Sequence, residues 1–171
     1  MFYKVFIYCV LLSAAGNAHQ DYTFTELVKL QNLNKTAFDS LMQKGNFHFT
    51  NIQENKTLKT RRDIFKPAEE DSTEDVNKIE RSEDTVYFGK KHHMVVLVTV
   101  SLFSYNLNYY NRLIEQCKNE GFNFRGAYTV DLEYPEFKTD EYRRAATVAQ
   151  FSTGKPDGKD VYRISLSRSP K

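Results

Sequence analysis

The sequence predicts an α+β fold with two layers, a mainly antiparallel sheet carrying two or three helices on one face. Three observations support this class. Apolar residues recur at helical spacing in three segments. They alternate with polar residues at period two in several others, as in half-buried strands. A pattern of helix, glycine and aromatic strand also occurs twice, which indicates a duplicated helix–strand unit.

Residues 1–18 have the composition of a secretory signal peptide, with Lys4 before the apolar run 5–12. The small residues required near a cleavage site follow: Ala14, Ala15, Gly16 and Ala18. We expect cleavage after Ala18, removal of Cys9 with the peptide, and a single domain over residues 19–171. An uncleaved membrane anchor is the alternative, but the apolar run has only about half of the roughly 20 residues that a spanning helix needs.

Cysteine content and charge limit the function classes. Cys117 is the one cysteine of the expected exported domain, so an intrachain disulfide is excluded. Its helical spacing from Leu113 predicts a buried side chain. The net charge is only +2, and acidic and basic residues are interspersed, so the chain has no nucleic-acid or membrane-surface footprint.

The N-terminal half of the domain is predicted to begin with two helices. The first has its stripe from Phe24 to Leu30, with Thr23 or Thr25 as its cap. The second runs from an Asn34 cap to Gly45, which is expected to be left-handed. The alternation from Phe47 to Ile52 then predicts a strand.

Residues 66–85 form the least apolar stretch, and we expect a flexible, solvated loop. Its acidic cluster comprises Glu69, Glu70, Asp71, Glu74 and Asp75. A calcium site or a surface for a basic partner is the alternative, but the acids lack the spacing of a calcium loop.

Residues 86–88 and 94–103 are predicted to pair as an antiparallel hairpin around the turn 89–93. Because Val95–Val98 are apolar at every position, we expect a central strand covered on both faces, at least along half its length. A helix over about 107–119, ending at Gly121, follows.

The C-terminal segment is predicted to be β-structure. Period-two alternation over 122–132 indicates a strand, and Gly126 marks a bulge or a close neighbour. A hairpin joins strands 145–153 and 160–167 through the turn 154–158. In the last strand we expect three side chains to face solvent, Arg163, Ser165 and Ser167. We expect the alternate side chains to face the core, Tyr162, Ile164 and Leu166.

The duplication is aligned by placing Gly45 over Gly121. This superposes Phe38 on Ile114 and Leu41 on Cys117, with Asn46 inserted before the aromatic strand. Chance similarity is the alternative, because any amphipathic helix fills these positions with apolar residues.

A short motif resembles a known group of proteins. It comprises Phe24, Leu27, Leu30, Phe38, Lys44, Gly45, Phe47 and Phe49 after a signal peptide. With it the chain resembles small secreted proteins of unknown function from Bacteroidetes-type bacteria. The resemblance implies a bacterial, exported, noncatalytic protein and transfers no functional residues.

No motif assigns catalytic, cofactor-binding or metal-binding residues. His92 and His93 are adjacent, so they cannot readily share one metal, and no Cys and His residues have zinc spacing. Asp131 and Glu133 share a strand face and could form a carboxylate pair, but exposed acids at a strand end are the commoner case. Asn34 and Asn55 begin glycosylation sequons, which matter only in a eukaryotic secretory protein.

Tyrosine and arginine residues form the one candidate contact surface for a protein or a glycan. They are Tyr105, Tyr109, Tyr110, Tyr128, Tyr134, Tyr142, Arg125, Arg143 and Arg144. Packing of the rings on the sheet is the alternative.

The sequence favours a secreted or periplasmic, noncatalytic binding domain without a cofactor, whose partner is a protein. The alternative is an exported hydrolase whose site assembles in space from His48 with Asp131 or Glu133.

Overall fold

The computed structural model describes residues 22–55, 60–67, 76, 78–88, 93–129 and 136–168. The predicted signal peptide, the acidic cluster at 69–75, His92 and the pair Asp131 and Glu133 lie outside the described residues.

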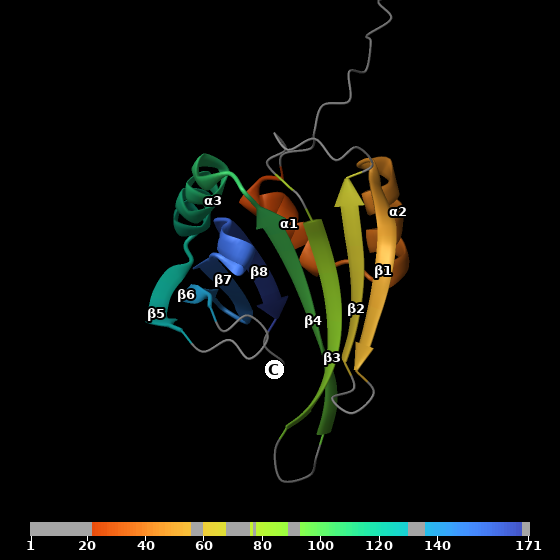
Figure 1. Cartoon of the computed structure of the whole chain (residues 1–171). Helices are drawn as coiled ribbons and strands as arrows, with labels where there is room; N and C mark the ends of the chain where they lie inside the picture. The colour runs from red at the N-terminus through yellow and green to blue at the C-terminus, as the bar shows by residue number, and fades with distance from the viewer. Residues whose placement is uncertain are drawn as a thin grey trace, which may run out of the picture.

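The predicted fold class is confirmed, because three helices pack on one face of an eight-strand antiparallel sheet (Figure 1). The helices are α1 (Phe24–Gln31), α2 (Lys35–Lys44) and α3 (Leu107–Asn119). The strands are β1 (Phe47–Asn55), β2 (Thr60–Pro67), β3 (Lys78–Phe88), β4 (His93–Ser104), β5 (Asn123–Tyr128), β6 (Lys138–Arg144), β7 (Thr147–Gly154) and β8 (Val161–Arg168). Their order in the sheet is β1-β2-β3-β4-β8-β7-β6-β5.

The fold consists of two similar units, each a helix followed by a four-strand meander. Helix α2 precedes β1–β4, and α3 precedes β5–β8. The last strands of the two meanders, β4 and β8, pair antiparallel and join the units into one sheet. Figure 1 shows the two groups of strands on opposite sides of this join.

The two units align at a different register from the predicted one. The left-handed residue after each helix is Asn46 (φ 61°) in the first unit and Gly121 (φ 80°) in the second. Superposing them gives a constant offset of 75 (121 − 46) without an insertion. Phe38 then matches Leu113 and Met42 matches Cys117, and all four side chains are buried.

The strands that follow these helices support the same alignment. One extra residue interrupts the pairing between Phe49 and Asn51 in β1, and another interrupts it between Phe124 and Gly126 in β5. Both pairs are related by the offset of 75. The predicted bulge beside Gly126 is therefore confirmed, and it has a counterpart in the first unit.

The helix starts are confirmed, and one helix end is corrected. Thr23 forms a capping box with Glu26, and the Asn34 side chain accepts a hydrogen bond from the Ala37 amide. Gly45 is not left-handed, because its φ is −82°. Asn46, a residue type that tolerates this conformation, adopts it instead.

The prediction of a loop over 66–85 is wrong for those of its residues that the structure describes. Lys66 and Pro67 belong to β2, and Lys78–Thr85 belong to β3. Ile79 is buried, and the neighbouring Glu80 and Arg81 are buried as well. Both charged side chains form ion pairs, Glu80 with Lys78 and Arg81 with Glu83. Because these partners compensate their charges, the two side chains can be buried away from solvent. The prediction also missed β2 and β6.

Strand β4 is central in the sheet, as predicted. It is covered on both faces near its C-terminal end, however, and not along the apolar run Val95–Val98 as expected. Leu102 and Phe103 point to opposite faces, and both are buried. Val96 is 51% exposed, so the apolar run Val95–Val98 is not covered on both faces.

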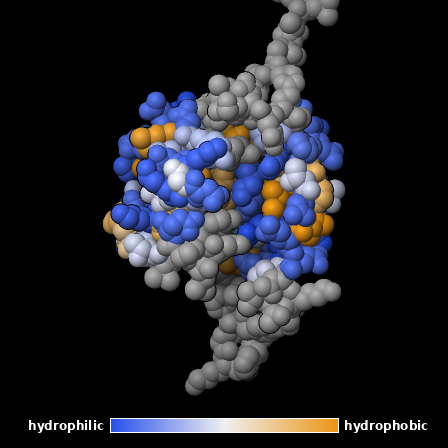
Figure 2. Space-filling view, in the orientation of Figure 1, coloured by the Kyte–Doolittle hydropathy of each residue, from blue (hydrophilic) through white to orange (hydrophobic). Residues whose placement is uncertain are grey.

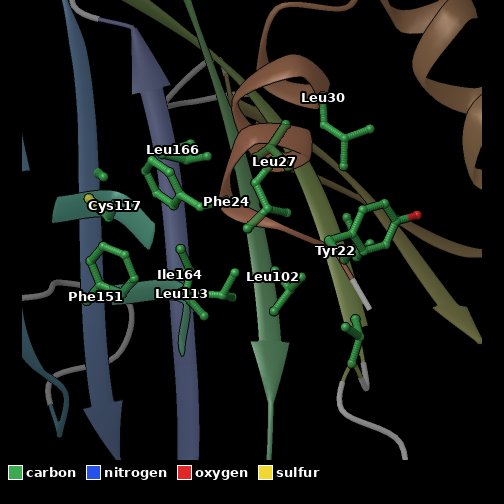
Figure 3. Close-up of a cluster of buried hydrophobic side chains, with 14 of the residues drawn as sticks. Tyr22, Phe24, Leu27, Leu30, Leu102, Leu113, Cys117, Phe151, Ile164 and Leu166 are labelled. Atoms are coloured by element: carbon green, nitrogen blue, oxygen red, sulfur yellow. The ribbon is translucent and has the colours of Figure 1, made fainter. Parts of the chain in front are cut away.

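The main core lies between α1 and the join of the two units (Figure 3). Figure 3 shows Phe24 and Leu27 of α1 directed at β4 and β8, where Leu102 and Ile164 are register partners. The Phe24 ring meets the Phe122 ring edge to face with centroids 5.1 Å apart. Cys117 is buried in this core, as predicted, and burial raises its pKa to about 12.

A cluster of charges attaches α2 to the sheet on the same face. Asp63 of β2 is almost fully buried and accepts from Lys35 of α2 at 2.7 Å and from Arg61 at 3.1 Å. Burial alone would lower the pKa of Lys35, but its hydrogen bonds to Asp39 and Asp63 outweigh burial and raise it. Hydrogen bonds to Asp63 likewise raise the pKa of Arg61. Asp63 thus fixes the position of α2.

We expect Asp63→Asn to lower the free energy of unfolding by about 1–3 kcal/mol, because Lys35 and Arg61 lose the carboxylate that they share. Urea denaturation followed by circular dichroism measures this change. Glu54→Gln is the matched control, since exposed Glu54 pairs with the same Arg61 at 3.7 Å; its effect should stay within about 0.5 kcal/mol. Equal losses for the two variants would contradict a structural role for Asp63.

Candidate functional site

The face of the sheet opposite the helices carries short hydroxyl side chains and is the strongest candidate for a functional surface. We call it the hydroxyl face and define it by Ser82, Thr99, Ser101, Thr139, Ser152, Ser165 and Ser167. Side chains alternate between faces along a strand, so Ser165 lies on the face opposite to its core neighbours Ile164 and Leu166.

The strand register aligns these residues in cross-strand rows. One row runs from Ser82 to Thr99 to Ser167 across β3, β4 and β8. The next row contains Glu80, Ser101 and Ser165. A third row contains Ser152 and Thr139 beside Arg163 on β8. Directly opposed residues share a face, so the hydroxyls of β3, β4 and β8 form one group, and Arg163 lies between this group and the pair Ser152 and Thr139 on β7 and β6.

Hydrogen bonds connect the hydroxyls within these rows. The Oγ atoms of Ser101 and Ser165 lie 2.8 Å apart, which joins the two units at β4 and β8. Thr139 Oγ1 and Ser152 Oγ also lie 2.8 Å apart. Arg163 donates from Nη2 to Ser152 Oγ at 3.3 Å. These contacts explain how Ser152, Thr139 and Ser165 are buried without a loss of hydrogen bonds.

The burial of Arg163 and Ser165 corrects a prediction, since both were expected to face water. Arg163 lies over the Phe137 ring, with its Cζ 5.1 Å from the ring centroid. Phe137 joins Phe103 and Val161 in a small second cluster that contains no helix residue. An aromatic side chain from outside the strands thus covers one end of the face.

Gly154 leaves the space that the Phe137 ring occupies. A Cβ atom at Gly154 would lie 1.7 Å from Cδ1 and 2.1 Å from Cε1 of Phe137. Such distances are far below van der Waals contact, so the ring packs directly on the Gly154 backbone. Only glycine fits at this position.

Paired charges flank the hydroxyls on both sides. In the first unit Glu80 accepts from Lys78 at 2.7 Å and lies 3.4 Å from Arg62. The Lys78 ammonium also lies 3.9 Å from the centroid of the Phe103 ring. In the second unit Glu141 accepts from Arg143 at 2.7 Å. The carboxylates that flank the face are therefore already neutralised.

Of the residues predicted for the hydrolase alternative, only His48 lies in the part of the chain that the structure describes. His48 is exposed on β1, at one edge of the sheet. Asp131 and Glu133 follow β5, which forms the opposite edge, and lie outside the described residues.

The predicted tyrosine and arginine surface is divided by the fold. Tyr109, Tyr110 and Tyr142 are buried, which agrees with the packing interpretation. Tyr105 is exposed, whereas Tyr128 is half-buried and accepts a hydrogen bond from Gln150. Tyr134 lies outside the described residues.

Among the described residues, no group of three or more His, Cys, Asp or Glu side chains could hold a metal ion. Within the same residues, no helix has the length and apolar character needed to cross a membrane.

Comparisons with protein-family models, with curated proteins and with solved structures found no match for this chain. The resemblance to small secreted proteins of Bacteroidetes-type bacteria therefore stays a prediction.

We expect Gly154→Ala to lower the free energy of unfolding by about 1–3 kcal/mol, because the new methyl group displaces the Phe137 ring. Gly126→Ala is the matched control: Gly126 is also a strand glycine, and a Cβ there meets nothing within 4 Å. Its effect should stay within about 0.5 kcal/mol. Urea denaturation distinguishes the two, and a tolerated Gly154→Ala substitution would refute the packing of Phe137 on Gly154.

Proposed function

We propose that this chain is an exported, noncatalytic binding domain that holds a protein partner on its hydroxyl face. The observation that carries this proposal is the chemistry of the sheet face without helices. Three of the seven hydroxyl residues are buried and bonded within the sheet, and the other four are half-buried at neighbouring positions of β3, β4 and β8, where a partner can reach them: Ser82, Thr99, Ser101 and Ser167.

Side-chain length supports a protein as the partner. Ser82, Thr99 and Ser167 are only half-buried, so their hydroxyls and the adjacent backbone are accessible to another chain. A hydroxyl both donates and accepts a hydrogen bond, which suits the mixed donors and acceptors of a polypeptide surface. These residues also span β3, β4 and β8, a broad surface of the kind that protein partners cover.

The charges beside the hydroxyls support the same proposal. Glu80 and Glu141 are paired within the sheet, so a partner would not bury an uncompensated carboxylate when it covers the face. A partner on this face therefore gains polar contacts without the cost of burying an unpaired carboxylate.

Export rests on residues 1–18. Their basic start, short apolar run and small residues before position 19 support a cleaved signal peptide. The location would be the periplasm or the medium, and the absence of a disulfide in the predicted mature domain is compatible with either.

Capture experiments test the partner surface. Thr99→Arg with Ser167→Arg places two large charges at directly paired positions, and we expect at least a tenfold loss of the specific protein recovered from periplasm and medium. Asn111→Arg on the exposed side of α3 is the matched control and should leave recovery unchanged. Quantitative mass spectrometry measures recovery, and circular dichroism verifies folding.

Two outcomes would contradict the proposal. Wild-type protein could recover no specific protein above background, or the double arginine variant could recover the same protein in the same amount.

Intact mass measurement tests export. When the full-length chain is expressed in a bacterium, we expect the exported protein to begin at His19. Ala18→Leu should block processing, because signal peptidase needs a small residue before the cut, whereas Ala14→Leu should still be processed. Unprocessed wild-type protein confined to the cytoplasm would refute this part of the proposal.

A further inference from the structure

The β3–β4 hairpin of the first unit is longer than its counterpart in the second unit, the β7–β8 hairpin. Following the register from the two bulged strands gives one matching cross-strand row in each unit: Phe49, Phe65, Ile79 and Leu102 in the first, Phe124, Tyr142, Ala149 and Leu166 in the second. The second hairpin ends with the pair of Gly154 and Val161, five residues beyond this row (154 − 149), and the corresponding pair in the first hairpin is Asp84 and Leu97. Pairing between β3 and β4 continues for four more pairs, as far as Phe88 and His93.

We call the additional paired residues, 85–88 and 93–96, the β arm. Strand β2 last pairs with β3 at Asp84, and β8 last pairs with β4 at Thr99, so within the described residues the two strands of the arm pair only with each other. Figure 1 shows this end of β3 and β4 projecting below the other strands. Val96 of the arm is 51% exposed and belongs to neither core cluster. Because the second unit closes the same hairpin without an arm, the repeated fold does not require one.

The β arm is apolar in composition on both of its faces. Six of its eight residues are apolar: Val86, Tyr87, Phe88, Met94, Val95 and Val96. Successive residues of a strand belong to opposite faces, so the consecutive apolar residues of each strand supply both faces of the arm. In the view of Figure 2, by contrast, most of the surface of the described residues is hydrophilic and the hydrophobic areas are small. An arm of this composition is suited to surroundings that contact both of its faces and are themselves partly apolar.

Charge indicates the kind of surroundings that fit the β arm. Acidic and basic residues are interspersed over most of the chain, but no acidic residue occurs from Thr85 to Ile114. Lys90 and Lys91 lie in the sequence between the two strands of the arm. Apolar and aromatic residues combined with lysine, without acidic residues, form the composition with which proteins bind the surface of an anionic bilayer. A lipid surface also contacts both faces of an inserted arm at once.

We propose that the β arm is a membrane-contact element that inserts at the headgroup level of an anionic lipid bilayer. Each arm strand pairs on one side only, so its outer main-chain donors and acceptors need water, which excludes the hydrocarbon core. Four residues at about 3.4 Å each extend about 14 Å, which is sufficient for the shallow burial of about 5–10 Å that interfacial elements reach. They are too few for a strand that spans a bilayer, which needs roughly 9–11 residues.

This membrane contact is distinct from the proposed partner surface. The nearest row of the hydroxyl face contains Ser82 and Thr99, and the pair of Asp84 and Leu97 separates that row from the arm. A chain held at a bilayer by its arm therefore keeps the hydroxyl face available to a protein. The two proposals fail independently, because binding to lipid vesicles requires no protein partner.

Co-sedimentation with lipid vesicles tests the membrane contact. The chain is used from His19 onward, because the apolar run 5–12 of the predicted signal peptide would itself bind lipid. We expect at least tenfold stronger binding to phosphatidylcholine vesicles that contain about 30% phosphatidylglycerol than to phosphatidylcholine alone. Binding to the anionic vesicles should weaken as the ionic strength rises, because salt screens the attraction between the lysines and the lipid.

Two variants with the same change in charge locate the contact. Val96→Asp should weaken binding to the anionic vesicles at least tenfold, because it places a carboxylate in the arm. Leu107→Asp on α3 is the matched control and should bind like the wild type, since Leu107 is 48% exposed against 51% for Val96. Circular dichroism verifies that both variants fold.

Tryptophan fluorescence gives a second readout. The chain contains no tryptophan, so Phe88→Trp introduces a single fluorophore in the arm, and Phe124→Trp introduces one on the edge strand β5. Anionic vesicles should shift the emission of Phe88→Trp to shorter wavelengths and leave that of Phe124→Trp unchanged.

Several results would overturn the proposal. A wild-type chain that does not bind the anionic vesicles would exclude a bilayer and leave a protein as the occupant of the arm. Equal binding to the two kinds of vesicle would contradict recognition of anionic lipid. Equal effects of Val96→Asp and Leu107→Asp, or a shift in Phe124→Trp alone, would place the contact outside the arm.

Discussion

The pairing of β4 with β8 is the contact on which the rest of the structure depends. Each unit alone is a four-strand meander with one helix, and this pairing is the only one that joins them in the described sheet. It places Leu102 opposite Ile164 on the helix side and Phe103 opposite Arg163 on the other side. Helix α1, which precedes both units, packs across this join, so the core and the hydroxyl face are both set by one register.

The two faces of the sheet depart from a simple division into apolar inside and polar outside. The helix-covered face includes buried Asp63 and Arg81, which are stabilised by ion pairs with Lys35, Arg61 and Glu83. The opposite face buries Ser152 and Thr139, which bond to each other. In both cases a buried polar group is tolerated because its partner is supplied from a neighbouring element.

The two units match in their core and differ at their surface. Phe47 and Phe122 are equivalent and buried, whereas Phe49 and Phe124 are equivalent and exposed beside their bulges. Aromatic residues thus occur at both edges, although of these two strands only β1 lacks Lys and Arg.

Local signals in the sequence determined the elements whose stability comes from nearby residues. Thr23 and Asn34 cap their helices through contacts within one turn. The apolar stripe of α3 indicates where this helix begins and ends. The turn between β7 and β8 contains its own glycine and proline residues. Tertiary structure decided β2, β6 and the first half of β3. These strands contain charged residues such as Glu80 and Arg81, whose burial depends on ion pairs that a linear pattern does not reveal. It also decided the hydroxyl face: alternation predicts that Arg163 and Ser165 avoid the core, but only the pairing of distant strands and the Phe137 ring remove them from water.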